Sequence, residues 1–139
     1  MNRNKNKITP TQRRRLLDAV GKALAEQEWR ATADAECLEI DAARGLPMNN
    51  LEKARCKQYR AKARSLLSAQ DFIEKNGAIP RRQADLVRAA LTKTLLMIDD
   101  NLDGWLAPEA WTIWRTDCRE ARRKLRFLVP APAQRRGKT

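Results

Sequence analysis

The sequence predicts an all-α fold, a single compact bundle of four to five helices with basic disordered tails. Residues with high helix propensity, chiefly Ala, Leu, Arg, Glu, Lys and Gln, fill long intervals of the chain. β-Branched residues are sparse and never alternate with polar ones, so no strand is expected. Because glycine suits the position after a helix end and proline the first turn of the next helix, glycine–proline pairs mark helix boundaries. Three such pairs divide the chain: Gly45 and Pro47, Gly77 and Pro80, Gly104 and Pro108.

Four helical segments follow from these boundaries: 11–44, 48–76, 80–103 and 108–128. The first carries apolar residues at helical spacing in its front part (Leu16, Leu17, Val20, Leu24) and in its rear part (Ala31, Ala35, Leu38, Ala42). It is long, and a break near Gly21 or around Trp29 would divide it into two helices. The segments form one domain over residues 11–128, between a basic tail at 1–10 and another at 129–139.

The composition excludes several kinds of catalytic site. The chain has 139 residues and no histidine, which excludes Ser-His and Cys-His nucleophile pairs, histidine-bound zinc and imidazole acid–base catalysis. Cys37, Cys56 and Cys118 are far apart and form no C-x-x-C pair, so we expect reduced and mostly buried thiols. A non-enzymatic protein without a cofactor is therefore expected.

Targeting signals are not evident in the sequence. No apolar run approaches the roughly 18–20 residues that a bilayer span needs. The basic N-terminus is not followed by the apolar stretch of a signal peptide. We therefore expect a cytoplasmic protein that does not enter a membrane.

The net charge of +12, from 29 Lys and Arg against 17 Asp and Glu, is unevenly distributed. Residues 26–44 contain six acids and two bases, so the rest of the chain is still more basic. Eight bases repeat at i, i+4, i+7 and i+11, a spacing that gives a stripe about 60° wide on a helix. They are Lys53, Lys57, Arg60 and Arg64 in one segment and Arg115, Arg119, Arg122 and Arg126 in another.

Apolar residues occupy another face of each of these two helices. They are Cys56, Tyr59, Ala63, Leu66 and Ile73 in the first, and Trp114, Cys118, Ala121, Leu125 and Leu128 in the second. Residues 53–67 and 115–129 share five identities in fifteen positions, which we attribute to coincidence rather than to an internal repeat.

The two basic stripes predict contact with the phosphate backbone of DNA or RNA. Like charges at i, i+4 repel by a few tenths of a kcal/mol, so a row of them is favourable only opposite a polyanion. The planar guanidinium of arginine also suits phosphate. The alternatives are a solvated helix face, or ion pairs between the stripes and the acidic 26–44 segment. We expect little base recognition, since Trp111 and Trp114 belong to the core and Trp105, in a loop, is the best stacking candidate.

Two motifs suggest other functions. Residues 72–91 could form a helix-turn-helix that places Arg81, Arg82 and Gln83 against base edges. Asp99, Asn101, Asp103 and Gly104 match the start of a calcium-binding EF-hand loop, but Ala110 stands where the bidentate glutamate is required. The acids at Asp99, Asp100 and Asp103 would be a weak basis for a magnesium nuclease. We therefore expect no metal.

A small, basic, all-helical chain without a catalytic residue set is typical of accessory subunits that line a nucleic-acid path in larger assemblies. Small subunits of CRISPR effector complexes and phage or plasmid DNA-processing factors are of this type. We expect a non-catalytic, sequence-tolerant nucleic-acid-binding protein whose acidic 26–44 segment faces other subunits or copies of itself. The alternatives are a helix-turn-helix regulator, and a protein-interaction module or inhibitor that docks on acidic protein surfaces.

Overall fold

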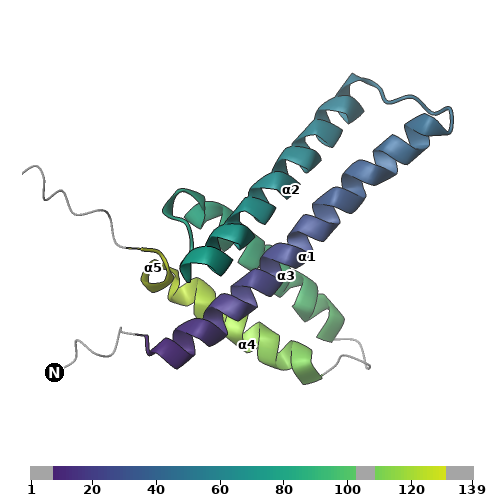
Figure 1. Ribbon diagram of the computed structural model, residues 1–139. Coiled ribbons are helices and arrows are strands. Elements are labelled where there is room, and N and C mark those ends of the chain that lie inside the picture. Colours follow the sequence, from purple (N-terminus) through teal and green to yellow (C-terminus); the bar gives the residue numbers. More distant parts are fainter. Residues whose placement is uncertain (1–7, 103–108, 131–139) are drawn as a thin grey trace, which may run out of the picture.

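The structure, a computed structural model, describes residues 8–102 and 109–130 and confirms the all-α prediction (Figure 1). In these ranges it contains helices and no strand. The elements are α1 (Pro10–Ala43), α2 (Asn50–Asn76), the 3-10 helix η2 (Arg81–Gln83), α3 (Ala84–Leu102), α4 (Glu109–Arg123) and α5 (Leu125–Leu128). Most of both predicted tails lies outside the described residues.

Helix α1 is continuous, so the predicted break near Gly21 or Trp29 is wrong. It begins where the Thr9 side chain accepts a hydrogen bond from the backbone N–H of Gln12, with Pro10 in its first turn. A glycine inside a helix costs about 0.5–1 kcal/mol relative to alanine. On both sides of Gly21, however, Val20 and Leu24 are fully buried. Their packing outweighs that cost and keeps the helix intact.

The boundaries of α2 follow from its caps. The Asn49 side chain accepts from the backbone of Glu52, whose side chain accepts from the backbone of Asn49, so the helix begins at Asn50. It ends at Gly77, which has a φ of 62° and adopts the left-handed conformation predicted for a glycine after a helix. Helix α3 begins at Ala84, later than predicted, because residues 81–83 form η2. The backbone N–H of Ile79 donates to the carbonyl of Leu128 at 2.7 Å, which ties this connection to α5.

The predicted helix over 108–128 is wrong at its C-terminal end. Helix α4 ends at Arg123, and the backbone leaves helical geometry at Lys124 before α5. Leu125 and Leu128, which follow the bend, are both buried in the core. Residues 53–67 form part of one uninterrupted helix, whereas residues 115–129 are divided here, so the two similar segments differ in structure.

The main core lies where four helices meet. It is surrounded by the first half of α1, the second half of α2, α3, and the segment from α4 to α5. Its fully buried large side chains include Leu16, Val20, Leu24, Leu66, Ile79, Val87, Leu91 and Leu128. Both predicted apolar faces are confirmed: their members are buried, with Tyr59 and Trp114 partly so. In the part of the chain that the structure describes, no helix combines the length and hydropathy of a membrane span.

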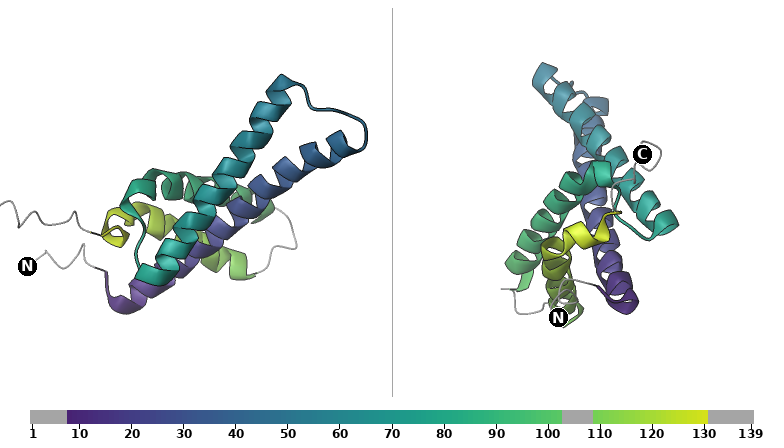
Figure 2. Two further views of the ribbon diagram at one scale, coloured as in Figure 1. Left: turned by 45° about the horizontal axis from the view of Figure 1, so that its top comes forward. Right: turned by 90° about the vertical axis from the view of Figure 1, so that its left-hand side faces the viewer.

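The far ends of α1 and α2 extend beyond α3 and α4 as a two-helix arm (Figures 1 and 2). The contact between these helices buries mainly small side chains: Ala31, Ala35, Cys56 and Ala63. Because such a seam is narrow, larger apolar side chains remain exposed on the arm. They are Ile40, Leu46 and Leu51, which are 49%, 66% and 60% exposed.

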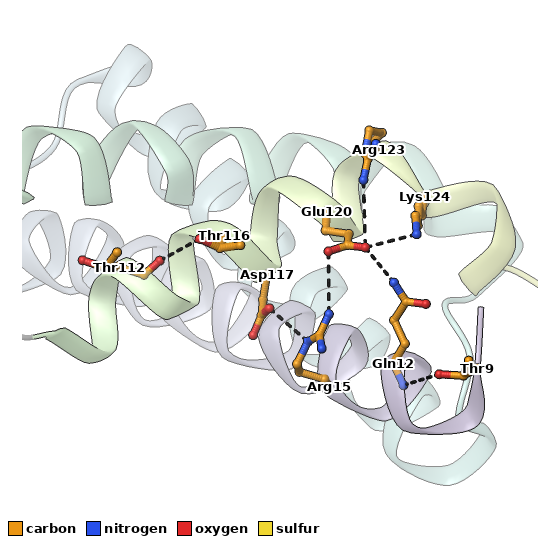
Figure 3. A network of polar contacts seen from close by, with 9 residues as sticks. All are labelled: Thr9, Gln12, Arg15, Thr112, Thr116, Asp117, Glu120, Arg123 and Lys124. Atoms are coloured by element: carbon orange, nitrogen blue, oxygen red, sulfur yellow. Dashed lines mark hydrogen bonds and ion pairs between the residues drawn. The ribbon is translucent and has the colours of Figure 1, made fainter. Parts of the chain in front are cut away.

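A polar network joins the start of α1 to α4 (Figure 3). The Glu120 carboxylate accepts a hydrogen bond from Gln12 at 2.6 Å and from the Lys124 ammonium at 3.1 Å. Arg15 reaches Asp117 at 3.1 Å and Glu120 at 3.6 Å. The hydrogen bond from Lys124 is the largest of several effects that hold the pKa of Glu120 below its ordinary value of 4.5. Glu120 therefore couples α1 to the end of α4.

Substitution Glu120→Gln is expected to lower the free energy of unfolding by about 1–2 kcal/mol at neutral pH, since it removes a charged acceptor. The stabilisation by Glu120 is complete above the pKa of the unfolded carboxyl and is lost as the pH falls through the lowered folded pKa. Thermal denaturation followed by circular dichroism should show a difference from the parent protein that narrows in acid. The control is Glu74→Gln on the exposed side of α2. An equal effect of both variants would contradict a coupling role for Glu120.

All three cysteines are free, and two of them are buried as predicted. Burial raises the pKa of the Cys118 thiol to about 12. The pKa of Cys56 is raised by burial and by the neighbouring Glu39 carboxylate. Cys37, however, is exposed, since it lies about 200° around α1 from the buried Ala35.

We expect a thiol reagent at about pH 8 to modify Cys37 rapidly and to reach Cys56 and Cys118 on unfolding, because the thiolate is the reactive form. The measurement is the number of fast-reacting thiols per chain in native and in denaturing buffer. The Cys37→Ser variant should lose the fast phase. A fast phase that persists in this variant would show that a buried thiol becomes accessible in the native protein.

Candidate nucleic-acid interface

Three of the four bases in the predicted stripe on α2 are free of ion pairs within the described chain. Lys53, Lys57 and Arg64 are exposed, and no ion pair joins them to the rest of the described chain. Arg60 instead pairs with Glu39 of α1 through both Nε and Nη2. The ion pair lowers the pKa of Glu39. Internal pairing with the acidic segment, one of the alternatives, therefore applies to Arg60.

Two arginines of the second stripe face an acid of α3. Arg115 and Arg119 approach the same Asp99 oxygen, at 3.4 Å and 3.8 Å. Arg115 is the more buried of the two, and its Nε has no hydrogen-bond partner among the described residues. The Arg115 side chain therefore lies between α3 and α4, whereas Arg119 remains largely exposed.

The second stripe does not continue along one helix. Arg126 lies on α5, beyond the end of α4, and its guanidinium is 4.7 Å from the centre of the Phe127 ring. The bend at Lys124 thus separates Arg126 from the other three bases. Arg122 stays on α4 and its Nη1 donates to the Thr92 hydroxyl of α3 at 3.3 Å.

The packing of α3 against α4 gathers arginines that no single helix brings together. An open hollow of about 700 Å³ is lined by Arg88 of α3 and by Arg119, Arg122 and Arg123 of α4, together with Thr116 and Glu120. We call it the arginine hollow. Its one carboxylate, Glu120, already accepts from Gln12 and Lys124, and Arg123 is 3.9 Å away from it (Figure 3). The hollow therefore presents four guanidinium groups against one engaged acid.

Sequence reasoning missed Arg88 and Arg123. Arg88 lies on α3, where it belongs to no basic repeat, and the approach of α3 to α4 alone places it beside Arg119 and Arg122. Arg123 follows Arg122 directly and therefore falls outside the i, i+4 spacing. Arg123 could have been found by counting every base near the end of the helix, but Arg88 had no sequence signal.

The helix-turn-helix candidate has a different geometry from the motif. Residues 77–83, which include η2, separate α2 from α3, whereas the motif joins its helices by a turn of about three to four residues. Gln83 donates to the backbone carbonyl of Ser65 at 3.0 Å, and Arg81 donates to that of Pro130 at 2.9 Å. Arg82 is exposed. Two of the three predicted base readers are therefore engaged within the protein.

Two of the three tryptophans considered for base stacking lie on α4 and pack against each other. Trp114 donates its Nε1–H to the Ala19 carbonyl at 3.2 Å and packs on the main core, as predicted. Trp111 is partly buried and packs edge-on against Trp114 with ring centres 6.2 Å apart. Trp105, the predicted stacking residue, lies outside the described residues.

The described residues contain no cluster of three or more Cys, Asp or Glu side chains that could hold a metal ion. Asp99, the first position of the EF-hand-like stretch, faces Arg115 and Arg119. The rest of that stretch from Asp103 to Pro108 lies outside the described residues.

Comparisons of the chain with protein-family models, with curated proteins and with solved structures found no match. The arrangement of its own side chains therefore has to carry any functional proposal.

Proposed function

We propose that this protein binds nucleic acid through the phosphate backbone, without base specificity and without catalysis, as an accessory subunit of a larger nucleoprotein assembly. The observation that carries the proposal is the arginine hollow. Four guanidinium groups from two helices share this hollow with one carboxylate, Glu120, which Gln12 and Lys124 already engage, so positive charge is in excess there. Arginine binds phosphate through two parallel hydrogen bonds, so the hollow suits successive phosphates of a nucleic-acid strand.

The exposed bases of α2 support the same proposal. Lys53, Lys57 and Arg64 offer a second row of phosphate contacts on the α1–α2 arm. Guanidinium groups stay protonated near neutral pH and are poor acid–base catalysts. The proposal therefore includes binding and no reaction.

The test is a salt titration of binding to random single-stranded and double-stranded oligonucleotides. The logarithm of the affinity should fall linearly with the logarithm of salt, by about 0.9 per phosphate contact on duplex and about 0.7 on a single strand. The triple variant Arg88→Gln, Arg119→Gln, Arg123→Gln should reduce the slope by about two to three on duplex. No binding at low salt would refute the proposal, and strong preference for one duplex sequence would favour the helix-turn-helix alternative.

A control of equal charge separates the arginine hollow from the overall charge of the protein. The triple variant Arg14→Gln, Arg44→Gln, Lys75→Gln removes three exposed bases that lie elsewhere. It should keep most of the parent's slope. Equal slopes for both triple variants would show that binding follows net charge and does not depend on the hollow.

The arm supports a second candidate function, association with another copy of the chain. Ile40, Leu46 and Leu51 expose apolar surface there. Next to them, α1 carries acids such as Asp34 and Asp41 and α2 carries bases such as Lys53 and Lys57. None of these four has an ion-pair partner within the described chain. An antiparallel second arm would cover the apolar side chains and bring the two charge types together.

Sedimentation at several protein concentrations tests this association. The double variant Leu46→Ser, Leu51→Ser should be monomeric at concentrations where the parent protein dimerises, because it removes the apolar contacts. The control Leu96→Ser changes an equally exposed leucine on α3 and should dimerise like the parent. A parent protein that remains monomeric at about 100 μM would exclude a dimer of micromolar affinity.

A further inference from the structure

A second concave site lies where α1, α2 and α3 meet, apart from the arginine hollow. It is a hollow of about 340 Å³, which we call the three-helix pocket. Side chains of all three helices line it, and those that bear on its chemistry are Trp29, Arg30, Asp34, Tyr59, Lys62 and Lys93. Lys93 follows Arg88 by five residues, which turns it about 140° around α3. The pocket therefore opens on another side of α3 from the arginine hollow.

Two lysines from different helices meet in this pocket. Lys62 of α2 and Lys93 of α3 both line it, and Lys93 has the largest effect on the pKa of Lys62. This neighbour and partial burial lower the pKa of Lys62 to about 8, and the carboxylate of Asp34 opposes the shift. Neither lysine forms an ion pair within the described chain. Two adjacent ammonium groups destabilise the fold unless an anion joins them.

A buried hydrogen bond joins two of the helices that carry the pocket. The buried Gln27 amide donates to the buried Thr94 hydroxyl at 3.2 Å, which links α1 to α3 below the pocket. Arg30 is held by Glu26, one turn earlier on α1, at 2.8 Å. The Gln27–Thr94 hydrogen bond thus fixes α1 against α3 beside the pocket, whereas the Lys93 side chain itself is exposed.

Aromatic rings line the same pocket. Trp29 is 66% exposed, an unusual position for an indole, and Tyr59 is partly buried. Flat aromatic faces beside cations are the elements with which proteins hold a nucleobase next to its phosphate. A pocket built for inorganic anions alone would need neither ring.

We propose that the three-helix pocket binds a single nucleotide, with its phosphate between Lys62 and Lys93 and its base against Trp29 or Tyr59. The nucleotide is either a free mononucleotide or one unpaired nucleotide of a strand. A phosphate between the lysines raises the pKa of Lys62 back toward its ordinary value. Binding therefore takes up a proton above about pH 8, and affinity falls as the pH rises through this value. Arg30, Asp34, Tyr59 and Lys93 are the other ionisable groups that face the pocket.

Titration calorimetry with adenosine 5′-monophosphate, adenosine, inorganic phosphate and a short single-stranded oligonucleotide tests the proposal. Either the mononucleotide or the oligonucleotide should bind to the parent protein. Lys62→Gln and Lys93→Gln should each weaken that binding about tenfold, the loss of one charged contact. Lys75→Gln, an exposed lysine on α2 outside the pocket, should leave it unchanged.

The two sources of the nucleotide give different results. Binding of the mononucleotide identifies a free ligand, with adenosine and inorganic phosphate each weaker because each lacks half of the contacts. Binding of the oligonucleotide but not of the mononucleotide, weakened by Lys62→Gln and by Lys93→Gln, identifies an unpaired nucleotide of a strand, since binding at the arginine hollow would not depend on these lysines. Absence of binding by both probes, or unchanged affinity in both lysine variants, would overturn the proposal.

Stability measurements separate loss of binding from loss of folding. Lys62→Gln and Lys93→Gln each remove one of two repelling charges, so their melting temperatures should equal or exceed that of the parent protein. The Arg88→Gln, Arg119→Gln, Arg123→Gln variant should retain mononucleotide binding. The proposals for the three-helix pocket and for the arginine hollow can thus be refuted independently of each other.

Discussion

The contacts of α1 with α2, α3 and α4 hold the rest of the structure together, because the first half of α1 supplies side chains to every part of the main core. Leu16, Val20 and Leu24 are fully buried there. The second half of the same helix has a narrow seam of small residues against α2 and continues outward as the arm. The continuity of α1 through Gly21 is therefore what fixes the direction of the arm relative to the four-helix core.

The same packing decides which charges are neutralised. Glu120, Asp117 and Asp99 each bind bases across helix contacts, and Glu39 binds Arg60 across the α1–α2 seam. These pairs stabilise the contacts between helices. Their carboxylates are engaged within the protein and do not neutralise other bases at the surface. Other bases gather in two concave places on different sides of α3, and a further group lies exposed on α2. Helix packing thus concentrates part of the positive charge that is spread along the sequence.

The two sites differ in a way that matters for binding. The arginine hollow is the wider one and is lined by groups suited to bidentate contact with phosphate, the basis on which we propose it as the site of a continuous backbone. The three-helix pocket is smaller and has Trp29 and Tyr59 beside two lysines, the basis on which we propose it as the site of a single nucleotide. The arm extends away from the main core (Figure 2). Ile40, Leu46 and Leu51 are exposed on it.

The sequence by itself determined the helical class, the boundaries at Gly45 and Gly77, and the apolar faces of the two basic helices, because these depend on local propensity and on spacing along one helix. It could not show that Gly21 would remain helical, which the burial of Val20 and Leu24 decides, or that the chain would bend at Lys124. Nor could it assign Arg60 to Glu39, or bring Arg88 to Arg122 and Lys62 to Lys93. The members of these pairs are 21 to 34 positions apart in the sequence and lie on separate helices, so only the packing of one helix on another brings them together.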